Sequence, residues 1–264
     1  MRTQLTSAEI SRYRKDGFVR IENFFTADEL CKWRKIISTA VTARDERIPG
    51  RNDGGVLGDE FYDNVFTQRV NLWQTSPAVK ELVLNKAIGQ MAATLEDIPG
   101  MRLWHDQALF KGPWANPTAW HIDNPYWSFY SKHATTIWIA LDDVTLQNGA
   151  LYCLPGAYRQ ASYDNVAIGK NVGSLFNVYP DWKDREPVCI EMKAGDASFH
   201  NGLTPHAAGP NMTPRQRRAF AIIYMPDGCR YNGQRNVLPQ ALFEKLNKGD
   251  LLNNNAFNPI IYQR

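Results

Sequence analysis

A change near Met101 from helix-like to strand-like sequence patterns constrains the fold of this chain more than any other feature of its sequence. Before this point, two Thr-x-x-Glu capping boxes, at Thr6 and Thr26, predict helix starts, and residues 77–84 and 87–95 have the pattern of further helices. After it, short alternating or apolar runs between Gly, Pro, Asn and Asp predict strands at residues 102–111, 135–141, 150–154, 188–192, 197–200 and 218–225. Helices followed by many short strands predict an α+β chain, mainly β, with a β-sandwich or jelly-roll core.

The length of 264 residues suits one domain with a full core. We expect residues 1–264 to form a single domain, mostly helical over residues 1–100 and jelly-roll over residues 101–264. Three long segments rich in Gly, Asn or Asp are predicted to be mobile loops, at residues 49–60, 163–186 and 227–236. We expect at least one of them to close over the functional site.

The charge and cysteine content exclude several classes of protein. The net charge is +3, from 30 basic and 27 acidic residues, which is too small a basic excess for a nucleic-acid partner and favours a small-molecule substrate. The four cysteines lie far apart, without a C-x-x-C pair, as in proteins of a reducing cytoplasm. The N-terminal residues lack the apolar stretch of a signal peptide, and no run of about 18 apolar residues occurs. We therefore expect a cytoplasmic location and no membrane role, whereas the oligomeric state is not readable from the sequence.

A possible metal site begins at His121 and Asp123, which stand two residues apart. In extended backbone both side chains point to the same face. A second imidazole from a distant strand, His200 or His206, completes a set of two histidines and one carboxylate, and spacing alone does not choose between them. Such a facial triad leaves three positions open on iron(II).

The two other histidines, His105 and His133, are expected to be core or surface residues, or to lie near the pocket without binding metal.

An arginine-rich turn and strand follow the second histidine, with Arg215, Arg217 and Arg218. A guanidinium group here can hold a carboxylate by two parallel hydrogen bonds. A solvated basic turn is the alternative interpretation, favoured only where the metal ligands are absent.

Several ordered motifs make the chain resemble the phytanoyl-CoA dioxygenase family of iron(II)- and 2-oxoglutarate-dependent oxygenases over most of its length. They are Asp16-Gly17-Phe18-Val19, His121-Ile122-Asp123, Asn148-Gly149-Ala150-Leu151, Leu154-Pro155-Gly156, and His206-Ala207-Ala208-Gly209-Pro210-Asn211 with Arg217-Arg218-Ala219. The resemblance implies a double-stranded β-helix (jelly-roll, cupin-like) core with N-terminal helices packed on one sheet. It also implies iron(II) as cofactor, with 2-oxoglutarate and O2 as cosubstrates.

By this resemblance the iron ligands are His121, Asp123 and His206, because the family's distal ligand directly precedes a small-small-Gly-x-Asn stretch. His200 is then not a ligand.

The resemblance also implies residues that bind 2-oxoglutarate. Arg217 matches the arginine that binds the far carboxylate, with Arg215 and Arg218 as competitors for that role. Trp138 matches an aromatic residue that lines the cosubstrate site, and Lys111 matches a lysine that contacts 2-oxoglutarate.

Strand alternation then places Gln107 on the same face as Lys111, so Gln107 is a further predicted polar contact, with core packing as an equal alternative.

Two departures from the family stand out: Ala208 replaces a serine that contributes a hydroxyl to the cosubstrate, and Ala157-Tyr158 replaces Ser-His in the loop after a strand. One hydrogen bond to the cosubstrate is lost or replaced, while the predicted metal ligands are unaffected.

The expected reaction is oxidation of an unactivated C–H bond, by hydroxylation or by desaturation or ring closure, with 2-oxoglutarate converted to succinate and CO2. Asp123 stands where related halogenases have a small residue, so halogenation is not expected. The aromatic residues 124–130 and the alternating set Arg69, Asn71 and Trp73 are candidate pocket walls. Polar and aromatic residues together favour a small metabolite or natural-product intermediate.

Three other functions compete with this one. They are an acyl-CoA hydroxylase, a jelly-roll metal-binding protein without oxygenase activity, and a protein or nucleic-acid demethylase. The demethylase has no support from net charge, and a plain metal site needs no dicarboxylate clamp.

Overall fold

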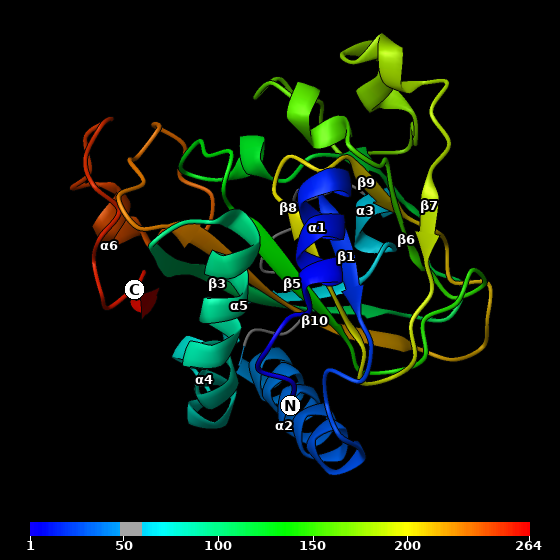
Figure 1. The fold of residues 1–264 in the computed structure, drawn as a ribbon. Coiled ribbons are helices and arrows are strands. Elements are labelled where there is room, and N and C mark those ends of the chain that lie inside the picture. Colours follow the sequence, from blue (N-terminus) through cyan, green and yellow to red (C-terminus); the bar gives the residue numbers. More distant parts are fainter. Residues whose placement is uncertain (48–59) are drawn as a thin grey trace.

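Two antiparallel β-sheets form the core, and helices cover the outer side of the larger sheet in the computed structural model, which describes residues 1–47 and 60–264 (Figure 1). The larger sheet has the order β1 (Phe18–Ile21), β8 (Ala197–Asn201), β5 (Thr135–Ala140), β10 (Arg217–Pro226), β3 (Gly100–Lys111) and β11 (Ile260–Gln263), and β2 (Thr67–Val70) also pairs with β3. The smaller sheet has the order β4 (Thr118–His121), β9 (His206–Ala208), β6 (Leu151–Cys153) and β7 (Val188–Ile190). This confirms the jelly-roll, mainly β class, and each predicted strand is present.

The helices begin where the sequence predicts, because their capping groups are in place. Thr6 Oγ1 accepts a hydrogen bond from the Glu9 amide, and the Glu9 carboxylate accepts one from the Thr6 amide. Thr26 and Glu29 make the same pair of bonds. The helices are α1 (Ser7–Asp16), α2 (Ala27–Arg47), α3 (Glu60–Asp63), α4 (Pro77–Val83), α5 (Lys86–Glu96) and α6 (Gln240–Phe243), with 3-10 turns η1 (Leu72–Gln74), η2 (Asn124–Tyr126), η3 (Ala157–Gln160), η4 (Ser174–Asn177) and η5 (Pro180–Trp182).

Alternation along β10 explains how one sheet serves two cores. Phe220 and Ile222 are fully buried in the cluster under the helices. Ala219, Ala221 and Ile223 belong to the cluster between the two sheets. Because the two alanines are small, they leave room between the sheets, and Ala221 and Ile223 line a cavity there.

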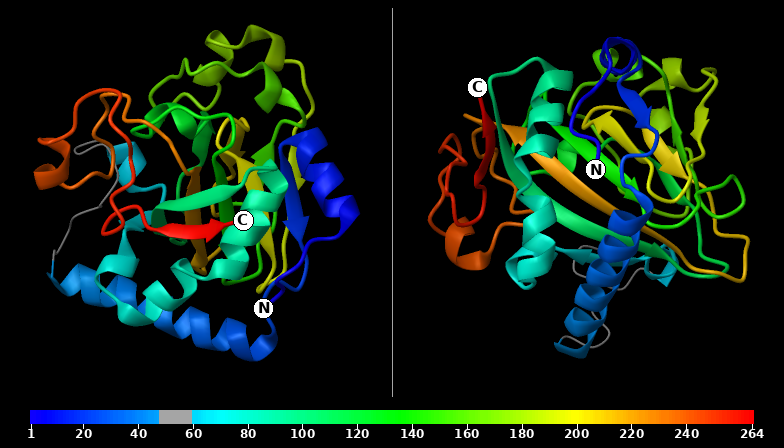
Figure 2. Two further views of the ribbon diagram at one scale, coloured as in Figure 1. Left: turned by 60° about the vertical axis from the view of Figure 1, so that its left-hand side comes forward. Right: turned by 60° about the horizontal axis from the view of Figure 1, so that its bottom comes forward.

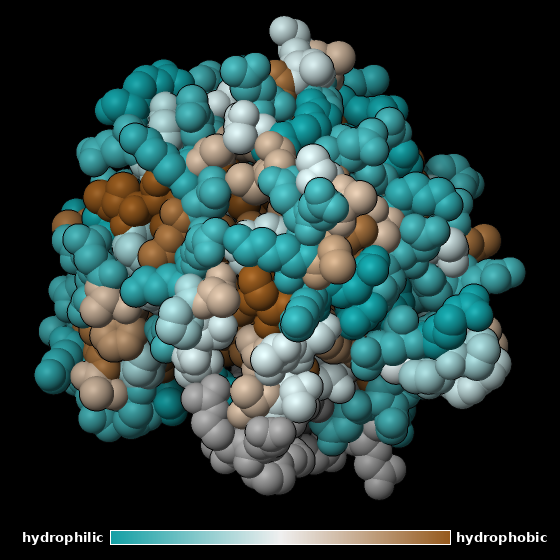
Figure 3. Space-filling model, turned by 90° about the horizontal axis from the view of Figure 1, so that it is seen from below, coloured by the Kyte–Doolittle hydropathy of each residue, from teal (hydrophilic) through white to brown (hydrophobic). Residues whose placement is uncertain are grey.

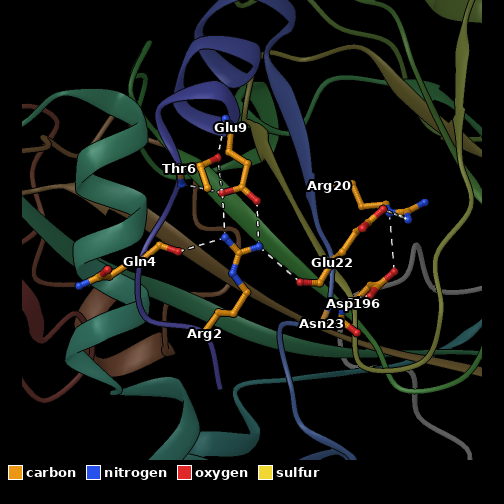
Figure 4. Close-up of polar contacts among 8 residues, drawn as sticks. All are labelled: Arg2, Gln4, Thr6, Glu9, Arg20, Glu22, Asn23 and Asp196. Carbon is orange, nitrogen blue, oxygen red and sulfur yellow. Dashed lines mark hydrogen bonds and ion pairs between the residues drawn. The ribbon is translucent and has the colours of Figure 1, made fainter.

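A polar network fixes the N-terminal segment against the edge of the larger sheet (Figure 4). Arg2 donates to both carboxylate oxygens of Glu9, at 2.8 and 2.9 Å, and to the Glu22 carbonyl at 3.4 Å. Arg20 of β1 lies 3.6 Å from a carboxylate oxygen of Asp196. These contacts support the pairing of β1 with β8.

The connection between β6 and β7 projects from the top of the molecule in Figure 1 and in the left view of Figure 2. It contains the predicted loop 163–186, which is folded into η4 and η5 and anchored by the buried Trp182. Tyr179 stacks on Trp182 with ring centroids 3.8 Å apart. The predicted loop 49–60 lies outside the described residues, apart from Glu60 in α3. Seen from below, the surface is mostly hydrophilic, with apolar side chains showing between polar ones (Figure 3).

Candidate active site

A cavity of about 290 Å³ lies between the two sheets. Strands β3, β5, β8 and β10 line it on one side, and β4, β6 and β9 on the other. Two of the predicted loop regions reach it, through Ala167 and Ile168 in one and Asn236 at the end of the other. The predicted site residues that line it are His121, Asp123, His206, Arg217, Trp138 and Gln107.

The side chains of His121, Asp123 and His206 converge at one wall of this cavity. His121 of β4 stands opposite His206 of β9 in the strand register. Asp123 Oδ1 lies 3.5 Å from Nε2 of His121 and 3.9 Å from Nε2 of His206. One donor atom from each of the three residues lies within 4.8 Å of the other two, so a single ion can contact all of them.

The backbone brings Asp123 to this point in a way that differs from the expectation. β4 ends at His121, and Asp123 has helical backbone angles, φ −76° and ψ −43°. A turn, and not a continuous strand, therefore brings the carboxylate beside the histidines. The prediction that extended backbone places both side chains holds for His121 alone.

Second hydrogen bonds orient both imidazoles. Nδ1 of His121 lies 2.8 Å from the Ala119 carbonyl oxygen, and Nδ1 of His206 lies 3.0 Å from that of Thr204. Because a carbonyl oxygen only accepts, Nδ1 carries the proton in both rings, and Nε2 keeps a lone pair for a metal. Burial, and then the charge of His121, lower the pKa of His206 to about 3, so its imidazole is neutral. Burial alone raises the pKa of Asp123, but the neighbouring imidazoles of His206, His121 and His200 outweigh it and hold that pKa well below its usual range.

The donor set of two imidazoles that point Nε2 at one place, and one carboxylate, fits iron(II).

The remaining histidines occupy three different surroundings. His200 lines the cavity, and its Nε2 lies 3.6 Å from Asp123 Oδ2, but it does not belong to the convergent three-residue set. His105 also lines the cavity; its Nδ1 donates to the Asp106 carbonyl at 3.2 Å, and burial lowers its pKa to about 4. His133 is 54% exposed and faces Glu96 at 3.4 Å, away from the cavity.

Arg217 is a buried cation that faces the cavity, and the described residues offer it no carboxylate partner. Only 3% of it is exposed, and its guanidinium carbon lies 5.0 Å from the ring centroid of Trp138. Its hydrogen bonds to the carbonyls of Leu109 and Gly149 are long, at 3.4 and 3.3 Å, and Nε has no hydrogen-bond partner among the residues that the structure describes. Burial lowers the pKa of Arg217 to about 10. Within residues 1–47 and 60–264, no acidic side chain forms an ion pair with it.

The two competing arginines point elsewhere. Arg218 forms a two-bonded pair with Asp142, with both distances 2.8 Å, and Arg215 is exposed.

Lys111 stands opposite Arg217 in the register of β3 and β10, yet it does not line the cavity. Its fully buried ammonium donates to the Asn116 carbonyl. Burial, and then the charge of Arg217, lower the pKa of Lys111 to about 7. Gly149 makes room for this side chain, because a Cβ at its positive φ of +96° would lie 2.6 Å from Lys111 Cδ.

Gln107 lines the cavity as alternation predicts, and it pairs with Gln68 of β2 at 2.5 Å. β2 lies against β3 with Val70 opposite Gln107, so Gln68 and Val70 face the cavity. The prediction that Arg69, Asn71 and Trp73 form a pocket wall was therefore wrong. Arg69 and Asn71 alternate with Gln68 and Val70 and so point away from the cavity, and Trp73 lies in η1 and does not line it. The aromatic segment after the H-x-D motif does contribute, through Tyr126 and Trp127.

Two hydroxyl-bearing residues of the cavity escaped the sequence reasoning. Thr118 stands directly opposite Ala208 across β4 and β9 and presents a hydroxyl where Ala208 has none. Counting in twos from His121 misses Thr118, because the strand register shifts between the two residues. Thr136 of β5 also lines the cavity, and its buried Oγ1 has no hydrogen-bond partner in the described part of the chain.

Comparisons with known proteins agree with this geometry. The family model for phytanoyl-CoA dioxygenase (PhyH) matches residues 13–219. The chain is 28% identical over 227 residues to methylphosphonate hydroxylase of Gimesia maris, covering 85% of this chain and 82% of that protein. It is 26% identical over 278 residues to phytanoyl-CoA dioxygenase of Arabidopsis thaliana, covering 90% and 97%. The crystal structure of the non-heme alpha ketoglutarate dependent carbocyclase SnoK from nogalamycin biosynthesis superposes with a TM-score of 0.82 at 26% identity, covering 97% of this chain and 96% of SnoK.

None of the described helices combines the length and apolar character needed to cross a membrane.

Proposed function

The chain belongs to the phytanoyl-CoA dioxygenase family, and we propose that His121, Asp123 and His206 hold its iron(II) while Arg217 binds 2-oxoglutarate. The enzyme is a non-haem iron(II)- and 2-oxoglutarate-dependent dioxygenase that oxidises a small molecule. When bound, iron with 2-oxoglutarate and O2 supplies an oxidant for an unactivated C–H bond, and 2-oxoglutarate becomes succinate and CO2.

One observation carries the proposed residue roles. A cationic side chain, Arg217, is buried without an ion-pair partner among the described residues, in the same cavity as two histidines and a carboxylate. A buried unpaired charge is costly, and a guanidinium group suits bidentate binding of a carboxylate. The far carboxylate of 2-oxoglutarate supplies the missing negative charge, while its keto acid end reaches the metal. Trp138 packs against the guanidinium and restricts its movement.

Lys111 and Gln107 have different parts in this proposal. The Lys111 side chain lies opposite Arg217 in the strand register and its hydrogen bond goes to Asn116, so we assign it no direct contact with 2-oxoglutarate. The Gln107 amide lines the cavity and is available to ligand. Thr118 provides a hydroxyl opposite Ala208, where the family's serine is missing.

The remaining part of the cavity favours a neutral substrate. Tyr126 and Trp127 supply aromatic surface, and His105 supplies a neutral imidazole whose Nδ1 already donates to a carbonyl. His105 Nε2 is then an acceptor for a hydroxyl group of the substrate. Arg217 is the single Arg or Lys among the described lining residues, and 2-oxoglutarate neutralises it. We infer a hydroxylated natural-product intermediate or similar neutral metabolite, in preference to an anion or an acyl-CoA thioester, oxidised by an enzyme of the cytoplasm.

Succinate formation tests these roles. The iron(II)-loaded wild-type protein should convert 2-oxoglutarate to succinate slowly without added substrate, and His206→Ala should abolish this conversion because a ligand is lost. His133→Ala, which removes an exposed histidine away from the cavity, is the matched control and should retain it. Wild-type rates in His206→Ala would overturn the ligand assignment.

The same assay tests the neutral substrate. Methylphosphonate should leave the succinate rate at its substrate-free level, because the described lining has no spare cation for an anion. Acceleration by methylphosphonate would contradict this proposal without affecting the ligand assignment.

A further inference from the structure

We propose that His200 is a positioning residue that holds the outer oxygen of Asp123, so that the carboxylate binds the metal through one oxygen. The proposal rests on the proposed iron site. It assigns a role to the histidine that the sequence could not distinguish from His206.

The two oxygens of Asp123 face different partners. Oδ1 faces Nε2 of His121 and of His206, at 3.5 and 3.9 Å. Oδ2 faces Nε2 of His200 at 3.6 Å. Within the described part of the chain, His200 is the group that faces Oδ2, and the other two imidazoles face Oδ1. Oδ1 is therefore placed for the metal, and Oδ2 is placed for His200.

The location of His200 suits a support and not a fourth ligand. It does not belong to the set whose donor atoms all lie within 4.8 Å of one another. Its ring centroid is 4.8 Å from that of His206, so the two rings pack side by side. The residue is only 3% exposed, which limits the water that can replace it beside Oδ2.

The backbone of His200 is held from three sides. It lies in β8, between Phe18 of β1 and Thr136 of β5 in the strand register. Its carbonyl oxygen accepts a hydrogen bond from Thr135 Oγ1 at 3.0 Å. A fixed backbone restricts where the imidazole can lie, and Nε2 stands just beyond ordinary hydrogen-bond distance of Oδ2, at 3.6 Å.

Such a support affects the metal more than the fold. A ligating carboxylate that loses its outer hydrogen bond can rotate, bind through both oxygens, or leave the metal. Loss of an outer partner of this kind typically weakens metal binding about 10- to 100-fold. It also changes the number of positions left for 2-oxoglutarate and O2.

The test compares His200→Leu with His200→Gln. Leucine fills the space without a donor, whereas the glutamine amide nitrogen reaches the position of the imidazole Nε2. The matched control is His133→Leu, which makes the same change at an exposed histidine away from the cavity. Iron(II) affinity is measured by anaerobic titration, and the charge-transfer band of the iron–2-oxoglutarate complex reports the coordination.

His200→Leu should raise the iron(II) Kd about 10- to 100-fold and shift or broaden the band. His200→Gln should restore most of both properties, and His133→Leu should match the wild type in both. An unchanged Kd and band in His200→Leu would overturn the proposal, as would a glutamine variant as impaired as leucine. Complete loss of iron in both His200 variants would make His200 a ligand instead. If the wild-type protein shows no band, the proposed iron site itself has failed, which is a different outcome.

Discussion

Replacing Arg217 by methionine should weaken 2-oxoglutarate binding and stabilise the ligand-free protein at the same time. Methionine keeps the hydrocarbon part of the side chain and removes the charge. In the proposed complex, two charge-assisted hydrogen bonds from Arg217 to a carboxylate would contribute about 3 kcal/mol together, even at the lower end of their usual strength. Their loss corresponds to about a 100-fold rise in the Kd for 2-oxoglutarate.

The gain in stability follows from the burial of the charge. Burial lowers the pKa of Arg217 from 12.5 to about 10, so at neutral pH the buried cation costs about 3 kcal/mol of folding free energy. The contact with Trp138 offsets about 1 kcal/mol of this, and the long bonds to carbonyls add little. Arg217→Met should therefore gain about 2 kcal/mol in the absence of ligand, or a few degrees in Tm.

Anaerobic titration with 2-oxoglutarate and thermal denaturation of the metal-free protein measure the two effects, with the exposed Arg215→Met as control. A variant that binds 2-oxoglutarate as the wild type does would place the clamp elsewhere. A lower Tm would show that the guanidinium stabilises the fold, contrary to the argument from burial.

Three further predictions concern stability. Burial lowers the pKa of Lys111 in the folded protein to about 7, against 10.5 in the unfolded chain. Between these two pH values the free energy of unfolding of the ligand-free protein should rise with pH by up to about 1.4 kcal/mol per unit, because the unfolded chain binds more protons. Chemical denaturation at pH 7 and 9 should show this rise in the wild type and not in Lys111→Met. Gly149→Ala should destabilise the protein by about 2 kcal/mol or more in the same assay, since its Cβ would clash with Lys111 in backbone of positive φ; a neutral result would contradict the packing around Lys111. Thr6→Ala should cost about 1 kcal/mol through loss of the α1 cap, and an unchanged midpoint would show that the cap is not formed in solution.

Local sequence signals were sufficient for much of the fold. The capping boxes at Thr6 and Thr26 start helices because their hydrogen bonds join residues only three apart. Strand alternation likewise placed Gln107 in the cavity, because β3 is regular through that region.

The site required information that local patterns lack. His200 and His206 both face the cavity, and only the pairing of β9 with β4 groups His206 with His121. Gln68 and Thr118 were missed because strand pairing and a register shift, respectively, decide which side chains face inward. Lys111 matched a motif, but its ammonium turns to the Asn116 carbonyl, which depends on a distant turn of the chain.

Anaerobic titration of the iron(II)-loaded protein with 2-oxoglutarate tests the central claim most directly. Chelation through the keto acid should produce a weak visible charge-transfer band that saturates at one equivalent of 2-oxoglutarate per iron, and His206→Ala should not produce it. Iron that is demonstrably bound, without such a band, would contradict the account and favour a jelly-roll metal protein that is not an oxygenase.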